Sequence, residues 1–216
     1  MDKEIIKYYS RLNGLNVSRE TFVDFENFIS LIIEKNRDLN IISTKNSGIE
    51  EIRLRHIIDS AQIIDFVDLN YNTTTDLGTG GGMPGIIIAI MLKKIKKNMK
   101  IHLFEKSFHK SNFLKDVSRK LNLKTEIFQK NIFEMKNMET GTIMSRAFKP
   151  LPVVLDLVYE NFSKYKNLIC FMGKNGRGLF ENEKKKWDLE YEEKKSLTSE
   201  DSFIINIKKI GKKKTN

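Results

Sequence analysis

The sequence predicts an α/β protein in which a mostly parallel sheet, closed by an antiparallel hairpin, follows an N-terminal helical cap. Three observations predict it: apolar residues recur at helical spacing before residue 70, strand and helix patterns alternate after it, and a glycine-rich turn joins the first strand to the first helix of that alternation. With 216 residues, 40% of them hydrophobic, the chain can bury a substantial core. We expect a cap over residues 1–70 and a ligand-binding domain over residues 71–216.

The cap is expected to be built from amphipathic helices. Ser18 followed by Glu20 indicates a helix start, and phenylalanine and isoleucine recur at helical spacing from there to Asn36. A second helix fits residues 49–66, and residues 3–12 are a candidate for another. These helices are too few to form a core alone, so we expect them to pack on the sheet domain.

From residue 72 the alternation predicts a parallel sheet with helices on both faces. The expected strands are 74–78, 100–105, 124–129, 142–146 and 167–172, and the expected helices are 84–96, 109–121 and 152–163. Two further strand-like stretches, 189–194 and 203–210, lie close together and are expected to close the sheet as a hairpin.

The turn between the first strand and the first helix of this sheet is the strongest nucleotide-binding signal. Gly78, Gly80 and Gly82 remove the Cβ atoms that would keep a ligand away from the backbone, and Pro84 suits a first helical turn. Glu105 ends the next strand, 23 residues after Gly82, where an acidic residue holds ribose hydroxyls in such folds. Turn, helix, strand and acid in this order favour a nucleoside or dinucleotide ligand over a tight connection without one.

Charge is distributed unevenly along the chain. The net charge is +10, yet residues 1–75 hold nine basic and twelve acidic side chains, whereas residues 93–130 hold twelve basic and three acidic ones. A local excess of this size favours binding to phosphate backbones. The alternative is a solvated lysine face in a lysine-rich protein.

Cysteine content and hydropathy limit the setting in which the chain works. The single cysteine, Cys170, excludes an internal disulfide and a multi-cysteine zinc site, so we expect no metal and a reducing, cytoplasmic location. There is no apolar stretch of 18 residues, and the N-terminus lacks the layout of a secretion signal, so we expect no membrane contact and no processing.

Two cofactors share this glycine turn, and the residues around it favour S-adenosylmethionine over NAD. Asp76 stands two residues before Gly78, as in methyltransferases, and only about 110 residues follow Glu105, which leaves little room for a separate substrate domain. An NAD-dependent oxidoreductase stays open as an alternative, although Tyr159 is followed four residues later by Ser163 rather than lysine. A noncatalytic RNA-binding or ribosome-assembly factor is the other alternative.

The side chains available for chemistry limit which atom of the substrate could be methylated. Cys170 lies within a buried strand, which disfavours carbon methylation through a thiol nucleophile, and Ser145-Arg146-Ala147 replaces the Asn/Asp-Pro-Pro-aromatic turn of amine methyltransferases. A ring nitrogen such as guanine N7 carries a free lone pair, so positioning suffices. Arg146 is the candidate to hold a guanine edge or a phosphate.

These motifs together resemble the RsmG (GidB) family of bacterial small-subunit ribosomal RNA guanine-N7 methyltransferases over nearly the whole chain. Four segments carry the resemblance: residues 36–40, the Arg55–Ser60 motif, the turn from Asp76 to Gly85, and Ser145-Arg146-Ala147. The resemblance implies a Rossmann-like class I methyltransferase sheet. The chain departs from the family pattern at His109-Lys110, Asn40-Ile41-Ile42 and Asn131-Ile132-Phe133.

The resemblance also implies roles for particular residues. S-adenosylmethionine is expected at Asp76, Gly78, Thr79, Gly80, Gly82, Met83 and Glu105. Arg146 is the expected catalytic residue, and the residues expected to face RNA or line the cleft are Asn40, Arg55, His56, Asp59, Lys110, Ser145 and Lys174. His56 and Asp59 are equally compatible with a pair that only stabilises a helix. The implied partner is small-subunit rRNA or the small ribosomal subunit, bound by a monomer.

Overall fold

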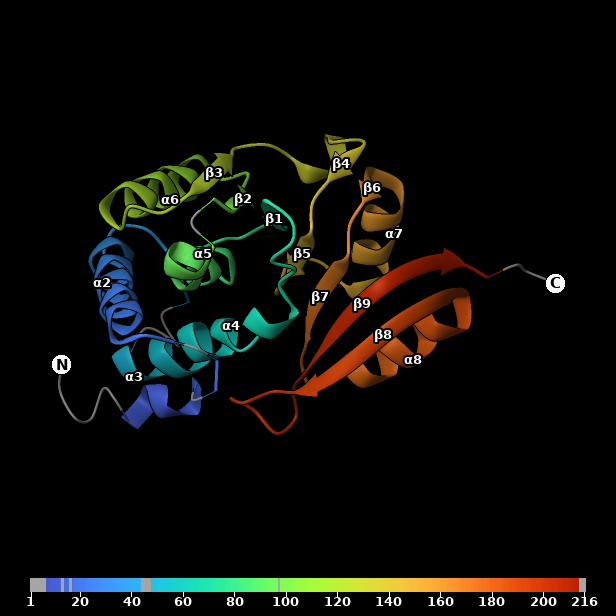
Figure 1. Ribbon diagram of the computed structural model, residues 1–216, viewed down its shortest axis with the longest axis horizontal. Coiled ribbons are helices and arrows are strands. Elements are labelled where there is room, and N and C mark those ends of the chain that lie inside the picture. The colour runs from blue at the N-terminus through green and yellow to red at the C-terminus, as the bar shows by residue number, and fades with distance from the viewer. Residues whose placement is uncertain (1–6, 13, 16, 44–47, 97, 214–216) are drawn as a thin grey trace.

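The computed structural model describes residues 7–12, 14–15, 17–43, 48–96 and 98–213. Its centre is a seven-stranded sheet in the order β3-β2-β1-β5-β7-β9-β8 (Figure 1). The strands are β1 Thr73–Asp76, β2 Lys100–Phe104, β3 Thr125–Phe128, β5 Thr142–Ser145, β7 Asn167–Met172, β8 Trp187–Lys195 and β9 Phe203–Lys212. The first five run parallel, and β9 lies antiparallel to β7 and β8. The predicted fold class and closing hairpin are confirmed.

Strand β1 lies at the centre of the parallel part. Thr75 is in register with His102 of β2 on one side and with Ile143 of β5 on the other. The threonines of β1 fit because β-branched residues suit a pleated, buried strand. The carboxyl ends of β1, β2 and β5 therefore meet at one edge of the sheet, where ligands bind in open α/β folds.

The helices that precede the sheet begin with η1 Ser10–Leu12 and α2 Arg19–Asn36. Ser18 caps α2 as predicted, because its Oγ accepts a hydrogen bond from the Thr21 N–H at 3.3 Å. The single helix predicted over 49–66 is instead α3 Ile49–Ile52, the π-helix η3 Arg53–Ile58, α4 Asp59–Ala61 and the 3₁₀ turn η4 Ile64–Phe66. Periodicity alone does not reveal a π-helical insertion, which adds one residue to the turn.

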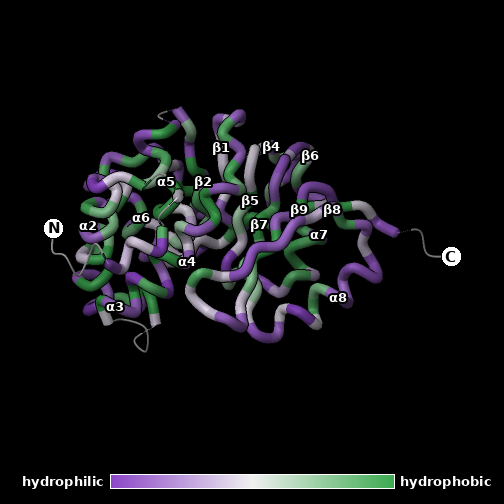
Figure 2. The backbone as a smooth tube through the Cα atoms, turned by 60° about the horizontal axis from the view of Figure 1, so that its bottom comes forward, coloured by the Kyte–Doolittle hydropathy of each residue, from purple (hydrophilic) through white to green (hydrophobic). Residues whose placement is uncertain are grey.

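One face of the sheet is covered by the N-terminal helices together with α5 Gly85–Ile95 and α6 Phe108–Lys120 (Figure 1). Phe25 and Ile29 of α2 share one hydrophobic core with Ile86 and Ile90 of α5. In Figure 2 the hydrophobic chain of α5 lies inside, between more hydrophilic outer segments. The cap thus packs on the sheet as expected, and its division from the rest at residue 70 stays a prediction.

The other face is covered by α7 Leu151–Asn161 and α8 Gly176–Lys186. Helix α8 was not predicted, because its two glycines and its lysine run resemble a loop in sequence. A second, two-stranded sheet of β4 Met138–Glu139 and β6 Phe162–Lys164 and the 3₁₀ turn η5 Ile132–Glu134 were missed as well. Within the described residues, no helix combines the length and the hydropathy that a membrane crossing requires.

Candidate active site

In the glycine turn that follows β1, three glycines adopt the left-handed backbone conformation. Gly78, Gly80 and Gly82 have φ of 62°, 58° and 99°. A Cβ at Gly78 would lie 2.2 Å from Cδ2 of Phe148, and one at Gly82 would lie 2.7 Å from Cγ1 of Ile86, whereas one at Gly80 would meet open space. Two glycines are therefore required by packing inside the protein, and Gly80 is the one whose bare backbone faces outward.

Asp76 stabilises the turn through two hydrogen bonds. Its Oδ2 accepts hydrogen bonds from the Thr79 hydroxyl at 2.6 Å and from the Gly85 N–H at 2.8 Å, and its Oδ1 is buried without a partner in the described structure. Burial raises the pKa of this carboxyl to about 6, although both hydrogen bonds act in the opposite direction. Asp76 thus shapes the start of α5 rather than facing a ligand.

Glu105 joins the turn to the end of β2. Its Oε2 accepts from the Gly80 N–H at 3.0 Å, and its Oε1 accepts from the Ser107 N–H at 2.7 Å. A carboxylate oxygen has two acceptor positions, so each oxygen keeps capacity for a further donor. The predicted ribose acid is thereby fixed against the outward-facing glycine.

A cavity of about 340 Å³ opens beside Gly80 and Glu105. It is lined by Gly78, Gly80, Phe104, Glu105, Lys106, Lys110, Lys130, Asn131, Ile132, Phe133, Ala147, Phe148 and Lys149. Of the predicted site residues, Gly78, Gly80, Glu105 and Lys110 line it. Its size lies within the range of small-molecule sites.

Four residues predicted at the cofactor do not line this cavity. Asp76, Thr79 and Met83 are buried, and Gly82 packs against Ile86. They act on the shape of the turn, since Thr79 donates to Asp76 and the Thr79 carbonyl accepts from the Gly82 N–H at 2.9 Å. They lie behind the cavity wall, and their direct contact with the cofactor stays a prediction.

An aromatic pair at the cavity was missed. The rings of Phe133 and Phe148 are stacked with centroids 6.0 Å apart, and Phe133 is 37% exposed. The only signal for them in the sequence is that each follows the end of a parallel strand by a few residues, and many residues without a role at the site share that position. Such rings offer a surface on which a flat heterocycle can stack.

These residues fit the group that the sequence predicts, S-adenosylmethionine. Glu105 supplies carboxylate oxygens for ribose hydroxyls, the outward Gly80 permits close approach, and Phe133 and Phe148 suit a purine. Among the described residues there is no cluster of three or more histidine, cysteine or acidic side chains suited to a metal. Cys170 is buried, and burial raises the pKa of its thiol to about 12.

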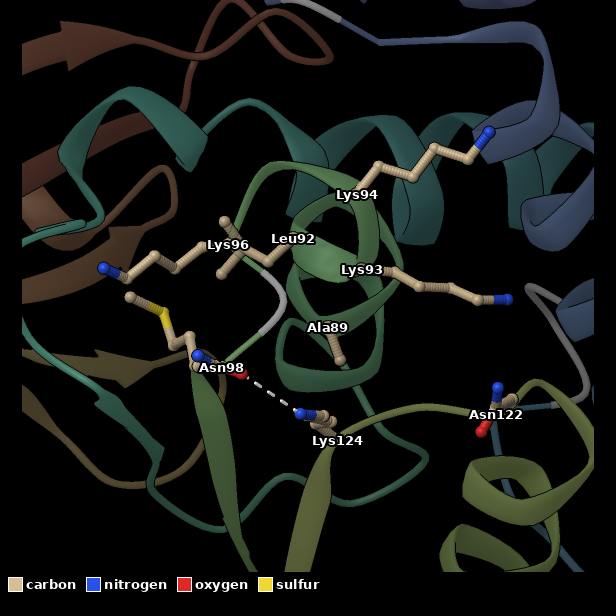
Figure 3. A pocket seen from close by; sticks show the side chains of 9 residues that line it. Ala89, Leu92, Lys93, Lys94, Lys96, Asn98, Asn122 and Lys124 are labelled. Carbon is tan, nitrogen blue, oxygen red and sulfur yellow. Dashed lines mark hydrogen bonds between the residues drawn. The ribbon is translucent and has the colours of Figure 1, made fainter.

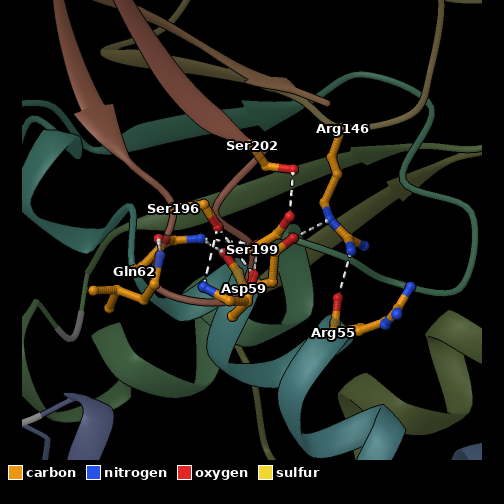
Figure 4. A network of polar contacts seen from close by, with 9 residues as sticks. Arg55, Asp59, Gln62, Arg146, Ser196, Ser199 and Ser202 are labelled. Atoms are coloured by element: carbon orange, nitrogen blue, oxygen red, sulfur yellow. Dashed lines mark hydrogen bonds and ion pairs between the residues drawn. The ribbon is translucent and has the colours of Figure 1, made fainter. Parts of the chain in front are cut away.

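Arg146, after β5, is held by the helical cap (Figure 4). Its Nε donates to Oδ2 of Asp59 at 3.0 Å, its Nη2 donates to the carbonyl of Arg55, and its guanidinium lies 5.7 Å from the ring centre of Phe171. The side chains of Arg146 and Asp59 are 19% and 16% exposed, so the pair is largely shielded from water. Residues 87 positions apart are thus brought together, as the resemblance implied.

Asp59 also connects to the closing hairpin. Its Oδ1 accepts from the Thr198 hydroxyl at 2.7 Å and from Gln62 Nε2 at 2.9 Å, and the Leu197 N–H donates to Gln62 Oε1 at 2.8 Å. Gln62 is completely buried. Three separate segments therefore determine where the Arg146 guanidinium points, and the residues from the hairpin were not predicted.

His56 lies beside this network in η3. Both of its ring nitrogens are buried without a hydrogen-bond partner in the described structure. Burial and the nearby charge of Arg146 lower the pKa of its imidazole to about 4, so the ring is neutral at pH 7. His56 is near the Arg146 pair, as predicted, without bonding to Asp59.

The remaining predicted residues occupy different surroundings. Arg55 is exposed and pairs with Glu51, Ser145 is buried at the end of β5, and Lys174 is exposed and does not line the cavity. Asn40 is exposed, in the segment whose Ile41 lies 3.0 Å from where a Cβ of Gly81 would be. Asn40 therefore precedes a residue that contacts the glycine turn in space, whereas Lys174 is not brought to the cavity.

The chain is similar to known methyltransferases in sequence. Residues 22–204 match the family model described as "rRNA small subunit methyltransferase G", GidB. A protein of Pelagibacter ubique named ribosomal RNA small subunit methyltransferase G is 60% identical over 98% of this chain and 99% of its own length. A protein of the same name from Bartonella henselae is 34% identical over 97% of this chain and 98% of its own.

Solved structures are similar in fold. A SAM-dependent methyltransferase of Aquifex aeolicus superposes with a TM-score of 0.55 at 13% identity, covering 72% of this chain and 92% of its own. The 16S rRNA methylase RmtB gives a TM-score of 0.53 at 12% identity, covering 94% and 80%. The predicted methyltransferase fold is therefore confirmed.

Proposed function

Since the chain belongs to the rRNA small subunit methyltransferase G (GidB) family, we propose that it transfers a methyl group from S-adenosylmethionine to guanine N7 in small-subunit ribosomal RNA. Its near full-length similarity to relatives of that name supports the reaction class and the RNA. The observation in the structure that carries the proposal is the contact between Gly80 and Glu105 at the cavity wall.

The cavity beside this contact would hold the cofactor. Glu105 would accept hydrogen bonds from the ribose hydroxyls, the bare Gly80 backbone would allow close approach, and the rings of Phe133 and Phe148 would offer a stacking surface to the adenine. When bound, S-adenosylmethionine supplies an electrophilic methyl group on a sulfonium. Lys106, Lys110, Lys130 and Lys149 surround the opening, where they attract the phosphates of the RNA.

The proposed target atom is one that needs no general base and that the hydrogen-bond donors of Arg146 can help to position. Guanine N7 carries a lone pair at neutral pH, so transfer needs alignment and no base. Among the described residues around Arg146, His56 has a lowered imidazole pKa and Asp59 is bound by Arg146, Thr198 and Gln62. Arg146 donates to the acceptor edge of the guanine or to its phosphate, oriented by Asp59.

Comparison of small-subunit rRNA from cells with and without the protein tests the reaction. Loss of 7-methylguanosine at one position, restored by the wild-type protein, is the expected result, and an unchanged content rejects the proposal. Purified protein should bind S-adenosylmethionine and not NAD in calorimetry, since NAD binding would support the oxidoreductase alternative. RNA binding without transfer of labelled methyl would support the noncatalytic alternative.

We also propose that the protein acts as a cytoplasmic monomer. The monomer is supported by the coverage of the sheet: helices of the same chain cover both of its faces, so neither face requires a second copy to bury it. Analytical ultracentrifugation at micromolar concentration should give a mass near 25.2 kDa. A dimer mass would contradict the monomer and would leave the proposed reaction untouched.

A further inference from the structure

A second cavity, of about 460 Å³, lies where β2 and β3 begin, whereas the cofactor cavity lies where they end. Figure 3 shows the side chains that line this second cavity. It is lined by Ala89, Leu92, Lys93, Lys94, Lys96, Asn98, Met99, Asn122 and Lys124. Four of the nine are lysines and two are asparagines, and none of these lining residues is acidic. The lining therefore offers many hydrogen-bond donors and an excess of positive charge.

Two of the lysines have an ordinary structural role. Lys93 Nζ donates to Asp24 Oδ2 at 3.0 Å and to the Leu121 carbonyl at 2.8 Å, and Lys94 pairs with Glu20 at 3.3 Å. Both lie in the last turn of α5, where a cation offsets the partial negative charge of the helix end. Their presence needs no ligand.

Lys96 and Lys124 lack such acidic partners. Lys96 is the C-cap of α5 and Lys124 comes four residues after α6, and in the described part of the chain neither forms an ion pair. Lys124 Nζ donates only to Asn98 Oδ1, at 3.4 Å, and the strand carboxylate of Glu126 is bound by Lys100 at 3.1 Å. Two ammonium groups thus remain uncompensated at the cavity.

The cavity is joined to the cofactor cavity by basic residues. Strands β2 and β3 begin at the lysine-lined cavity and end at the cofactor cavity, and β2 spans ~17 Å at the usual rise of a strand. β3 is an edge strand, flanked by Lys124 at its start and Lys130 after its end. Along the neighbouring α6, Lys115 and Lys120 are exposed between the two ends. A negatively charged chain can follow this edge from one cavity to the other.

We propose that the lysine-lined cavity binds a backbone phosphate of the substrate RNA at a nucleotide remote from the methylated guanine. Lys96 and Lys124 supply the charge, and the amides of Asn98 and Asn122 supply further donors for phosphate oxygens. This inference rests on the proposed function, because it assigns a second contact to the same substrate. A phosphate contact of this kind positions the RNA without sequence preference.

The test is the double substitution Lys96→Glu and Lys124→Glu, compared with Lys166→Glu and Lys185→Glu. The control changes the charge equally at two exposed lysines that are outside both cavities. Filter binding of full-length small-subunit rRNA should show a dissociation constant raised about 10-fold and a slope of log K against log salt reduced by about 1 in the first variant only. Its kcat and its affinity for S-adenosylmethionine should equal those of the wild type.

A dissociation constant and salt slope equal to those of the control variant would overturn the inference. If the glutamate variant unfolds, the neutral pair Lys96→Gln and Lys124→Gln gives the same comparison with a smaller expected change of about 4-fold. Failure of the proposed function is distinguishable, because the wild type would then transfer no methyl group to this RNA. A wild type that methylates normally beside an unaffected Lys96/Lys124 variant rejects only the second contact.

Discussion

The glycine turn and the surroundings of Arg146 are two neighbouring regions built in different ways. In the turn, Thr79 and Gly85 both donate to Asp76, within nine positions of sequence. Arg146 instead depends on Asp59, 87 positions before it, and Asp59 depends on Thr198, 139 positions further along. The hydrogen bonds of the first region are thus mostly local, with Glu105 the partner from another strand, whereas the second region requires three distant segments.

The difference separates the two tasks of the proposed enzyme. A turn whose own groups fix its shape presents the same surface before and after a ligand arrives, which keeps the ordering cost of cofactor binding low. A guanidinium held by three segments responds to any change in how they pack, so alterations far from the cavity reach the substrate side. We therefore expect substitutions in the two regions to alter different measured quantities.

The largest effect is expected from Gly78→Ala. Its Cβ would lie 2.2 Å from Phe148 in a residue with a left-handed φ, so the turn must shift. The free energy of unfolding should fall by ~3 kcal/mol, and affinity for S-adenosylmethionine should fall at least 100-fold. Denaturant unfolding and calorimetry measure the two.

Gly80→Ala is the matched comparison. Its Cβ meets open space, so the unfolding free energy should fall only by the ~1 kcal/mol of the left-handed conformation, while the cofactor affinity still falls. Equal losses of stability in the two alanine variants would contradict the assigned packing of Gly78.

Arg146→Ala should lower kcat about 500-fold and leave the S-adenosylmethionine dissociation constant within about 2-fold, because Arg146 bonds Asp59 and the Arg55 carbonyl and does not line the cofactor cavity. Arg146→Lys should recover little of the rate, since lysine lacks the second donor that reaches the Arg55 carbonyl. Single-turnover kinetics with saturating cofactor measure the step. Equal losses in rate and in cofactor affinity would place Arg146 in the cofactor site instead.

His56 and Asp76 should give opposite dependences of stability on pH. The folded-state pKa of His56 is lowered from 6.5 to about 4, so the unfolded chain binds its proton first and the unfolding free energy falls as pH drops from 6.5 to 4. The pKa of Asp76 is raised from 3.8 to about 6, so the folded chain binds that proton first and the unfolding free energy rises as pH drops from 6 to 3.8. Each contribution reaches ~3 kcal/mol.

Substitution separates these opposed contributions. Compared with the wild type, His56→Gln should become relatively more stable as pH falls from 6 to 4, and Asp76→Asn should become relatively less stable. Urea unfolding at several pH values measures both slopes. Parallel curves for all three proteins would contradict the assigned shifts.

Thr198→Val should have the smallest effect. It removes the 2.7 Å hydrogen bond to Asp59 and should lower the unfolding free energy by ~1 kcal/mol. The rate should fall a few-fold, because Asp59 still pairs with Arg146, and cofactor affinity should not change. Thr140→Val, at a buried threonine outside the Arg146 network, controls for loss of a buried hydroxyl: it should lower stability without slowing transfer.

The sequence was most informative where structure is local. Strand and helix alternation, the Ser18 cap and the turn depend mainly on residues near one another in sequence, and Glu105 follows the turn at the spacing typical of such folds; the structure confirms where each of them lies. The sequence predicted that Gly78 lets a ligand approach the backbone. The structure shows a different reason for this glycine: Phe148, 70 positions later, leaves no room for a Cβ. A contact between residues so far apart in the chain leaves no periodic pattern or motif spacing from which it could be predicted.

The part that could not be predicted is the part made by packing between segments. Thr198 and Gln62 belong to a hairpin loop and a helix end with no motif of their own, yet both bind Asp59. Placing Arg146 beside Asp59 needed the family resemblance, since residue types alone also suited a helix pair. Helix α8 was missed because this weakly apolar, glycine-containing sequence is stabilised by packing of its Phe180 against Tyr191 of the hairpin.

The hydrogen bond between Thr198 and Asp59 has a consequence for biosynthesis. Translation makes the glycine turn and Asp59 early, and Thr198 only after most of the chain has left the peptidyl transferase centre. A growing polypeptide can therefore form the cofactor crevice well before the guanidinium of Arg146 is locked in place.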